Sequence, residues 1–160
     1  LDKLPGGKRT KIGFITFDSK IHFYQINEGA MAPKMLVLSD LDDIFLPAEN
    51  DLLVNLDSNR ELIEQLLESL PHMHSNTNDI ETAVGPALDA ATRVMASNGG
   101  KMCLFLSGLP SLGFGRLKHR EDTRLLGTNN EHTILSPGDK FYKTSSQKKN
   151  LHGTRHQIQC

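Results

Sequence analysis

Short hydrophobic runs and longer helical patterns alternate along the first 110 residues of the chain. Residues 11–18 (KIGFITFD) and 21–26 (IHFYQI) are mostly apolar and are separated by a short turn. Such runs predict a β-hairpin, with the first strand buried and the second nearer to an edge. Residues 35–39 (MLVLS) predict a third strand. Residues 102–106 (MCLFL) are apolar on both faces, which predicts the centre of a parallel sheet covered by helices.

Apolar residues recur at helical spacing in two further segments. The first helix is predicted to start at a capping box, residues 58–61 (SNRE), and to end at Pro71. The second has a candidate capping box at residues 78–81 and ends at residues 98–100 (NGG). Pro86 is unfavourable in a helix interior, so either the second helix bends there or its regular part begins near Gly85.

These elements predict an α/β fold in which helices cover a sheet on both sides, in three layers. Beyond Gly113 the periodicity fades, and we expect mainly loop with one more helix around Phe141. The chain begins at Leu1 without a methionine, and a short alternation at residues 157–160 predicts the opening of another strand. We therefore expect the sequence to be a fragment.

Composition excludes several classes of protein. The 160 residues are 38% hydrophobic, the size and composition of one ordinary domain. Two distant cysteines, Cys103 and Cys160, form neither a disulfide framework nor a zinc pattern, which favours a reducing, cytosolic setting. No apolar run approaches the roughly 20 residues that span a bilayer, and the N-terminus lacks the apolar core of a signal peptide.

The net charge of −1 hides an asymmetry between the two ends of the chain. Residues 1–115 carry 9 Lys+Arg against 15 Asp+Glu, whereas residues 116–160 carry 9 against 4. Four of these cations form a basic run, interleaved with acidic residues and without aromatic residues: Arg116, Lys118, Arg120 and Arg124. Stacking platforms for nucleic acid need aromatic side chains, so we expect no nucleic-acid partner. Either the run contacts phosphate or acidic groups of a partner or membrane, or it is an ordinary solvated loop.

Three carboxylates follow the third predicted strand, at Asp40, Asp42 and Asp43. A calcium loop of the EF-hand kind needs alternating ligands, a glycine and a distant glutamate, and this segment lacks the last two. We therefore expect these carboxylates to lie near the N-terminus of a short helical turn, where they suit the helix dipole.

No other motif predicts catalysis. Residues 113–115 (GFG) lack the third glycine of a dinucleotide fingerprint and the Gly-Lys-Ser/Thr of a phosphate loop. His72 and His74 could bind a metal with partners from elsewhere, although exposed loop histidines are the more common case. No Gly-x-Ser-x-Gly elbow surrounds any serine. We expect the protein not to be an enzyme.

The order of these segments resembles one known family. The chain is similar, from about Arg9 to Thr144, to the trunk domain of the cargo-selecting subunit of the inner COPII vesicle coat, and most closely to its C and D type paralogues. The similarity rests on the following segments: KIGFITFDSKIHFYQI, MLVLSDLDDIFLP, LLVNLDSNRELIEQLLESLP, GRLKHREDTRLLGT and FYKT. Residues 1–144 are therefore expected to be a partial trunk domain, and residues 145–160 a divergent or disordered tail.

The resemblance implies a trunk of von Willebrand factor A type, lacking its first strand and its C-terminal strands. It implies pairing with the GTPase-activating coat subunit, binding of sorting signals on cargo and SNARE proteins, and contact with the acidic membrane at endoplasmic reticulum exit sites and on COPII vesicles. The protein would be cytoplasmic and peripheral to the membrane. It implies no cofactor in this segment, because the family's zinc finger precedes it.

The same resemblance bears on metal binding, because metal-binding type A domains use a loop threonine and an aspartate that ends a strand. Thr77 is expected at the threonine position, and Ser107 occupies the position of the aspartate. A serine hydroxyl is a poor replacement for a carboxylate on a hard cation. We therefore expect no metal site, and the alternative interpretation is a metal-dependent ligand-binding type A domain.

Overall fold

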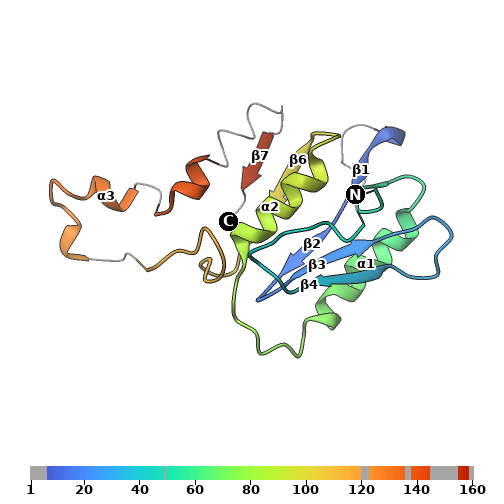
Figure 1. Ribbon diagram of the computed structural model, residues 1–160, viewed down its shortest axis with the longest axis horizontal. Helices are drawn as coiled ribbons and strands as arrows, with labels where there is room; N and C mark the ends of the chain where they lie inside the picture. Colours follow the sequence, from blue (N-terminus) through green and yellow to red (C-terminus); the bar gives the residue numbers. More distant parts are fainter. Residues whose placement is uncertain (1–6, 49, 120–122, 136–137, 145–154, 159–160) are drawn as a thin grey trace.

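The computed structural model describes residues 7–48, 50–119, 123–135, 138–144 and 155–158. Its main sheet has three antiparallel strands in the order β2 (Ile15–Phe17), β3 (Ile21–Gln25) and β4 (Lys34–Leu38). Figure 1 shows this sheet with α1 and α2 beside it. The predicted hairpin and third strand are confirmed, because β2 pairs with β3 and β3 pairs with β4.

The expected burial of the hairpin strands is wrong. β3 is the central strand and four of its five residues are buried, whereas β2 lies at an edge and is half-buried. The reason is that β4 returns to pair with β3. The first run is also broken at Gly13, where a Cβ atom would lie 2.3 Å from the Leu52 carbonyl oxygen. The residues before this break form β1 (Lys11–Ile12), which pairs with β5 (Val54–Asn55).

The two faces of β3 are covered by different helices. Ile21 and Phe23 pack in one cluster with Ala90 and Val94 of α2 (Val84–Met95). Tyr24 packs in a second cluster with residues of α1 (Arg60–Met73). Successive strand residues point to opposite faces, so the alternation of side chains in β3 places the sheet between the helices. The predicted α/β fold with a covered sheet is confirmed.

The helices differ from prediction at their ends. α1 starts after Asn59 rather than Ser58, and its end is later than predicted because it continues through Pro71 to Met73. The predicted capping box at residues 78–81 is wrong, since α2 begins only at Val84. Pro86 then lies in the first turn, where its missing N–H costs nothing. The glycine stop is confirmed: Gly99, with φ of 64°, donates its N–H to the Met95 carbonyl oxygen at 2.8 Å.

The strand β6 (Lys101–Leu104) pairs in parallel with β7 (Arg155–Ile158). The strand predicted to open at residues 157–160 is confirmed at residues 157–158, although it begins earlier, at Arg155, and residues 159–160 lie outside the described residues. The expected burial of both faces of residues 102–106 is wrong. Cys103 is exposed and Phe105 is 76% exposed. Within the described ranges β6 has β7 as its only strand neighbour, so its other edge is unpaired. One face of β6 is exposed, at Lys101 and Cys103.

The remaining segments are short. Residues 7–9 and 123–125 form the 3-10 turns η1 (Gly7–Arg9) and η2 (Thr123–Leu125), and α3 is His132–Leu135. The helix predicted around Phe141 is confirmed at residues 140–144. The helical turn expected after β4 is wrong, because residues 41–43 form a bend. The Asp40 carboxylate holds this bend by accepting the N–H groups of Asp42 and Asp43.

Candidate functional site

The loop that was compared with a metal site is held by hydrogen bonds to its neighbours. Thr77 is exposed, and its Oγ1 accepts the Asp79 backbone N–H at 3.1 Å. The Asp79 carboxylate accepts the hydroxyl and the backbone N–H of Ser19, in the turn between β2 and β3. The Ser19 hydroxyl is the main cause that lowers the pKa of Asp79.

A second set of contacts ties the same loop to the segment after β6. The Ser111 hydroxyl donates to the Glu81 carboxylate and accepts the Thr82 backbone N–H at 2.9 Å. Ser107, in this segment, is exposed. Among the residues that the structure describes, no group of three or more His, Cys, Asp or Glu side chains is arranged to hold a metal ion. The polar groups of these loops therefore hold the two segments together.

Sequence reasoning missed a chain of polar contacts on the α1 side of the sheet. Thr16 Oγ1 lies 3.3 Å from His22 Nδ1 and 2.9 Å from the Tyr24 hydroxyl. The Tyr24 hydroxyl lies 3.3 Å from Nε2 of His74, the residue that follows α1. The two histidine rings are 5.6 Å apart between centroids. The signal was present in IHFYQI, whose polar positions His22 and Tyr24 share one face, with His22 directly opposite Thr16 in the register.

Burial shifts the pKa of two members of this network, His22 and Tyr24. Burial is the largest cause that lowers the pKa of His22, the charges of His74 and Lys20 act in the same direction, and Asp18 opposes them. Burial likewise raises the pKa of Tyr24. His72, the other member of the predicted histidine pair, is exposed and takes no part in these contacts. His74 therefore contacts side chains of β3, whereas His72 is exposed.

The basic run is only partly described. Arg116 and Lys118 are exposed in a segment without regular secondary structure, and the exposed Arg124 lies in η2. Arg120 lies outside the described residues. A backbone hydrogen bond holds the start of this segment: the Leu117 N–H donates to the Pro110 carbonyl oxygen at 2.8 Å. The structure therefore shows Arg116 and Lys118 exposed next to this hydrogen bond.

The predicted turn at residues 113–115 packs against α2. A Cβ atom on Gly85 would lie 1.8 Å from the Phe114 carbonyl oxygen, so only glycine permits this contact. The Phe114 ring meets the Phe141 ring edge-on at 5.1 Å, and the Tyr142 hydroxyl donates to the Gly115 carbonyl oxygen at 2.6 Å. These contacts fix the position from which the basic run departs.

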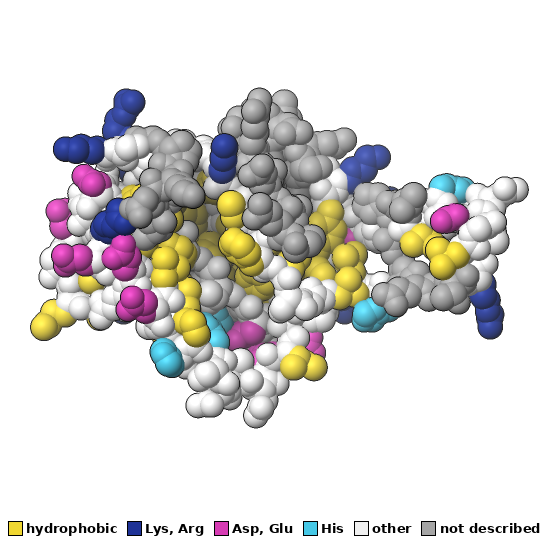
Figure 2. All heavy atoms as spheres, turned by 180° about the vertical axis from the view of Figure 1, so that it is seen from behind, with side chains coloured by type: hydrophobic (Ala, Val, Ile, Leu, Met, Phe, Trp, Pro, Cys, Tyr) yellow, Lys and Arg dark blue, Asp and Glu magenta, His cyan; other side chains and the backbone are white. Residues whose placement is uncertain are grey.

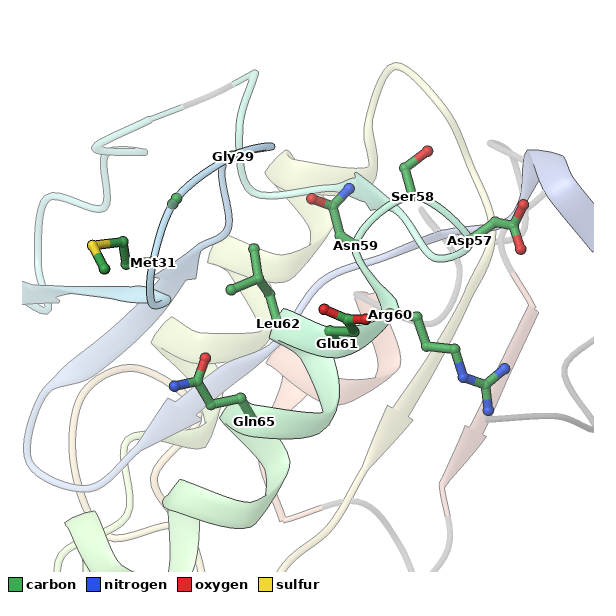
Figure 3. A pocket seen from close by; sticks show the side chains of 10 residues that line it. Gly29, Met31, Asp57, Ser58, Asn59, Arg60, Glu61, Leu62 and Gln65 are labelled. Atoms are coloured by element: carbon green, nitrogen blue, oxygen red, sulfur yellow. The ribbon is translucent and has the colours of Figure 1, made fainter.

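A groove of about 700 Å³ lies between the loop after β3 and the first turn of α1. Met31 lies on the loop side, and Glu61, Leu62 and Gln65 lie on the helix side (Figure 3). Asn59, at the start of α1, is 7% exposed and donates its amide N–H to the Asn55 carbonyl oxygen at 3.0 Å. Its Oδ1 atom is buried without a hydrogen-bond partner.

No helix in the described part of the chain has the length and apolar character needed to cross a bilayer.

Charged side chains are unevenly distributed over the surface. Figure 2 shows acidic side chains gathered at the end of the back face where α1 lies. Three exposed glutamates on α1 contribute acidic charge, namely Glu61, Glu64 and Glu68.

Comparison with known proteins places these observations in a family context. The family profile described as the Sec23/Sec24 trunk domain matches residues 1–155. The chain is 50% identical over 143 residues to human Protein transport protein Sec24B, covering 89% of the chain and 11% of that protein. It is 51% identical over 144 residues to SEC24 A of Arabidopsis thaliana, covering 89% of the chain and 14% of that protein.

A solved structure gives the same result. The crystal structure of the human COPII-coat protein Sec24c matches with a TM-score of 0.88 and 31% identity, over 96% of this chain and 21% of that one. The expected closeness to the C and D type paralogues is not confirmed, because human relatives of the A and B types share 47% and 50% identity. The chain spans 11% to 14% of the length of the relatives named above.

Proposed function

The chain belongs to the Sec23/Sec24 trunk domain family, and from this premise we propose that it is part of a COPII coat subunit that selects cargo for transport from the endoplasmic reticulum to the Golgi. The observation that carries the proposal is the match of residues 1–155 to the family profile. The names of the relatives support it, since they are protein transport proteins, and so does the solved chain named as a COPII-coat protein.

In this role the protein pairs with a GTPase-activating subunit of the Sec23 type and binds sorting signals on cargo and SNARE proteins. It acts as a peripheral component in the cytoplasm, at endoplasmic reticulum exit sites and on COPII vesicles. It acts through its surfaces and not as an enzyme. The division into a trunk at residues 1–144 and a divergent tail at residues 145–160 remains part of the proposal. So does the closeness to the C and D type paralogues.

The basic run is the proposed contact with the acidic membrane or with a partner: Arg116, Lys118, Arg120 and Arg124. The exposure of Arg116 and Lys118, and the net positive charge beyond residue 115, support this assignment. Each Lys or Arg near an anionic lipid surface contributes about 1 kcal/mol to binding at physiological ionic strength.

Recruitment to vesicles tests the proposal. The full-length protein, mixed with its GTPase-activating partner and the coat GTPase, should sediment with vesicles that contain phosphatidylserine. Reversing two charges, with Arg116→Glu and Lys118→Glu, should weaken recruitment about tenfold or more. The matched control, Lys34→Glu and Lys101→Glu, makes the same charge change at two exposed lysines outside the run and should leave recruitment within about twofold. Equal loss in both pairs would refute the assignment of the basic run, and no recruitment of the native protein would refute the coat role.

A further inference from the structure

We propose that the groove between the loop at residues 29–31 and the first turn of α1 binds an extended peptide through a basic side chain of that peptide. The groove has a volume of about 700 Å³, enough for one long side chain and the adjoining backbone. The inference does not depend on the coat role, because it rests on the groups that line this groove.

The unpartnered oxygen of Asn59 indicates a ligand that donates hydrogen bonds. The amide orientation is set by the bond from Nδ2 to the Asn55 carbonyl oxygen, so Oδ1 is the end left without a partner. Figure 3 shows this oxygen directed toward the side of the groove where Gly29 lies. A buried acceptor without a donor costs about 1–3 kcal/mol, which a ligand recovers by supplying an N–H group.

The charged groups around the groove favour a cation. Glu61 lies in the first turn of α1 and lines the groove, and Gln65 follows one turn later with a further amide oxygen. The one basic residue of the lining, Arg60, forms an ion pair with Glu64 at 3.0 Å, and Figure 3 shows its guanidinium pointing away from Met31. The positive end of the helix dipole opposes a cation, but its half charge is smaller than the full charge of Glu61.

The two walls suit the aliphatic part of a basic side chain. Met31 is 96% exposed on the loop, and Leu62 is half-buried on the facing helix turn. Lysine and arginine bury their methylene stems along apolar surface while the charged head group stays near acceptors. A basic side chain between Met31 and Leu62 therefore brings its head group to Glu61 and Gln65. The loop shifts slightly on binding, so that a backbone N–H of the peptide reaches the buried Asn59 oxygen.

A labelled peptide tests the proposal on the full chain. The probe is a fluorescein-labelled, C-amidated peptide of sequence Gly-Ala-Leu-Arg-Leu-Ala-Gly, and two matched probes carry Gln or Glu in place of Arg. Fluorescence anisotropy should show binding of the Arg probe, binding of the Gln probe about fivefold or more weaker, and still weaker binding of the Glu probe. In an NMR titration, the side-chain amide signals of Asn59 should shift on addition of the Arg probe.

Two variants locate the binding. Glu61→Lys should weaken the Arg probe about fivefold or more, whereas Glu68→Lys, an equal charge change on the same helix outside the groove, should change it less than about twofold. Met31→Ser leaves α1 intact and should weaken the Arg probe about threefold by removing apolar contact.

Three results would overturn the assignment. The first is an absence of binding of the Arg probe at about 1 mM, because a specific site of this kind should have a dissociation constant below that concentration. The second is binding of the Glu probe as tight as that of the Arg probe, which indicates an anion site at the helix terminus. The third is an equal loss for Glu61→Lys and Glu68→Lys, which indicates general charge attraction. None of these results bears on vesicle recruitment, so the two proposals fail separately.

Discussion

Replacing Tyr24 by phenylalanine removes the centre of the polar network beneath α1. The Tyr24 hydroxyl joins Thr16 Oγ1 at 2.9 Å to His74 Nε2 at 3.3 Å, and the residue is 2% exposed. Phenylalanine keeps the ring in the cluster with Ile63 and Leu66, so the apolar packing is preserved. The substitution therefore isolates the two polar contacts.

The expected cost is about 2 kcal/mol of unfolding free energy. Each neutral hydrogen bond contributes about 1 kcal/mol, and a buried group left without a partner costs about 1–3 kcal/mol. Thr16 keeps its contact with His22, so the unsatisfied group is mainly the His74 ring nitrogen. Tyr142→Phe is the matched control, because it removes one hydrogen bond, to the Gly115 carbonyl oxygen, from a half-buried hydroxyl. Its cost should be about 1 kcal/mol or less.

Urea denaturation followed by circular dichroism measures both variants. With a slope of about 2 kcal/mol per molar urea, Tyr24→Phe should lower the midpoint by about 1 M, and Tyr142→Phe by half of that or less. The reasoning is refuted if Tyr24→Phe lies within about 0.5 kcal/mol of the native chain, or costs no more than the control.

Two further predictions follow from single contacts. Because the pKa of His22 is lowered from 6.5, the unfolded chain binds the proton more tightly than the folded chain. The contribution of His22 to stability should therefore be constant above about pH 7.5 and fall as the pH drops below 6.5, by at most about 1.4 kcal/mol per pH unit. Urea titrations at several pH values measure this slope. His22→Gln should flatten the slope, and an unchanged slope would contradict the assignment to His22. Gly85→Ala should lower the melting temperature and cost about 1–3 kcal/mol of stability, because the new Cβ would lie 1.8 Å from the Phe114 carbonyl oxygen. Helix propensity alone predicts the opposite, a gain of about 1 kcal/mol. Gly108→Ala is its control, since the nearest atom there would lie at 3.7 Å, and a stabilised Gly85→Ala would show that the close contact is absent.

Local pattern was sufficient where neighbouring residues decide the structure. The hairpin, the two long helices and the glycine stop at Gly99 follow from periodicity and from backbone freedom. The burial of β3 could not be predicted in the same way, because it depends on β4 returning to the far side of β3 rather than on β3 itself. The exposed face of β6 has the same origin, since an apolar run does not reveal which neighbours cover it.

The polar contacts depend still more on distant residues. His74 was predicted as an exposed loop histidine, yet it meets Tyr24 across fifty positions of sequence because α1 extends through Pro71 and carries its end over the sheet. The groove at α1 was not anticipated, because SNRE was interpreted as a capping box in which the Ser58 side chain caps the helix. The structure uses Asn59 at that place and leaves its oxygen without a partner.

Association with the partner subunit tests the central proposal most directly. Sedimentation velocity of the full-length protein, mixed with an equimolar amount of a GTPase-activating subunit of the Sec23 type, measures whether the two form one particle. A single boundary with the mass of a one-to-one complex is the predicted result for a COPII subunit of this family. Two separate boundaries at micromolar concentration, with both proteins folded, would contradict the proposed function.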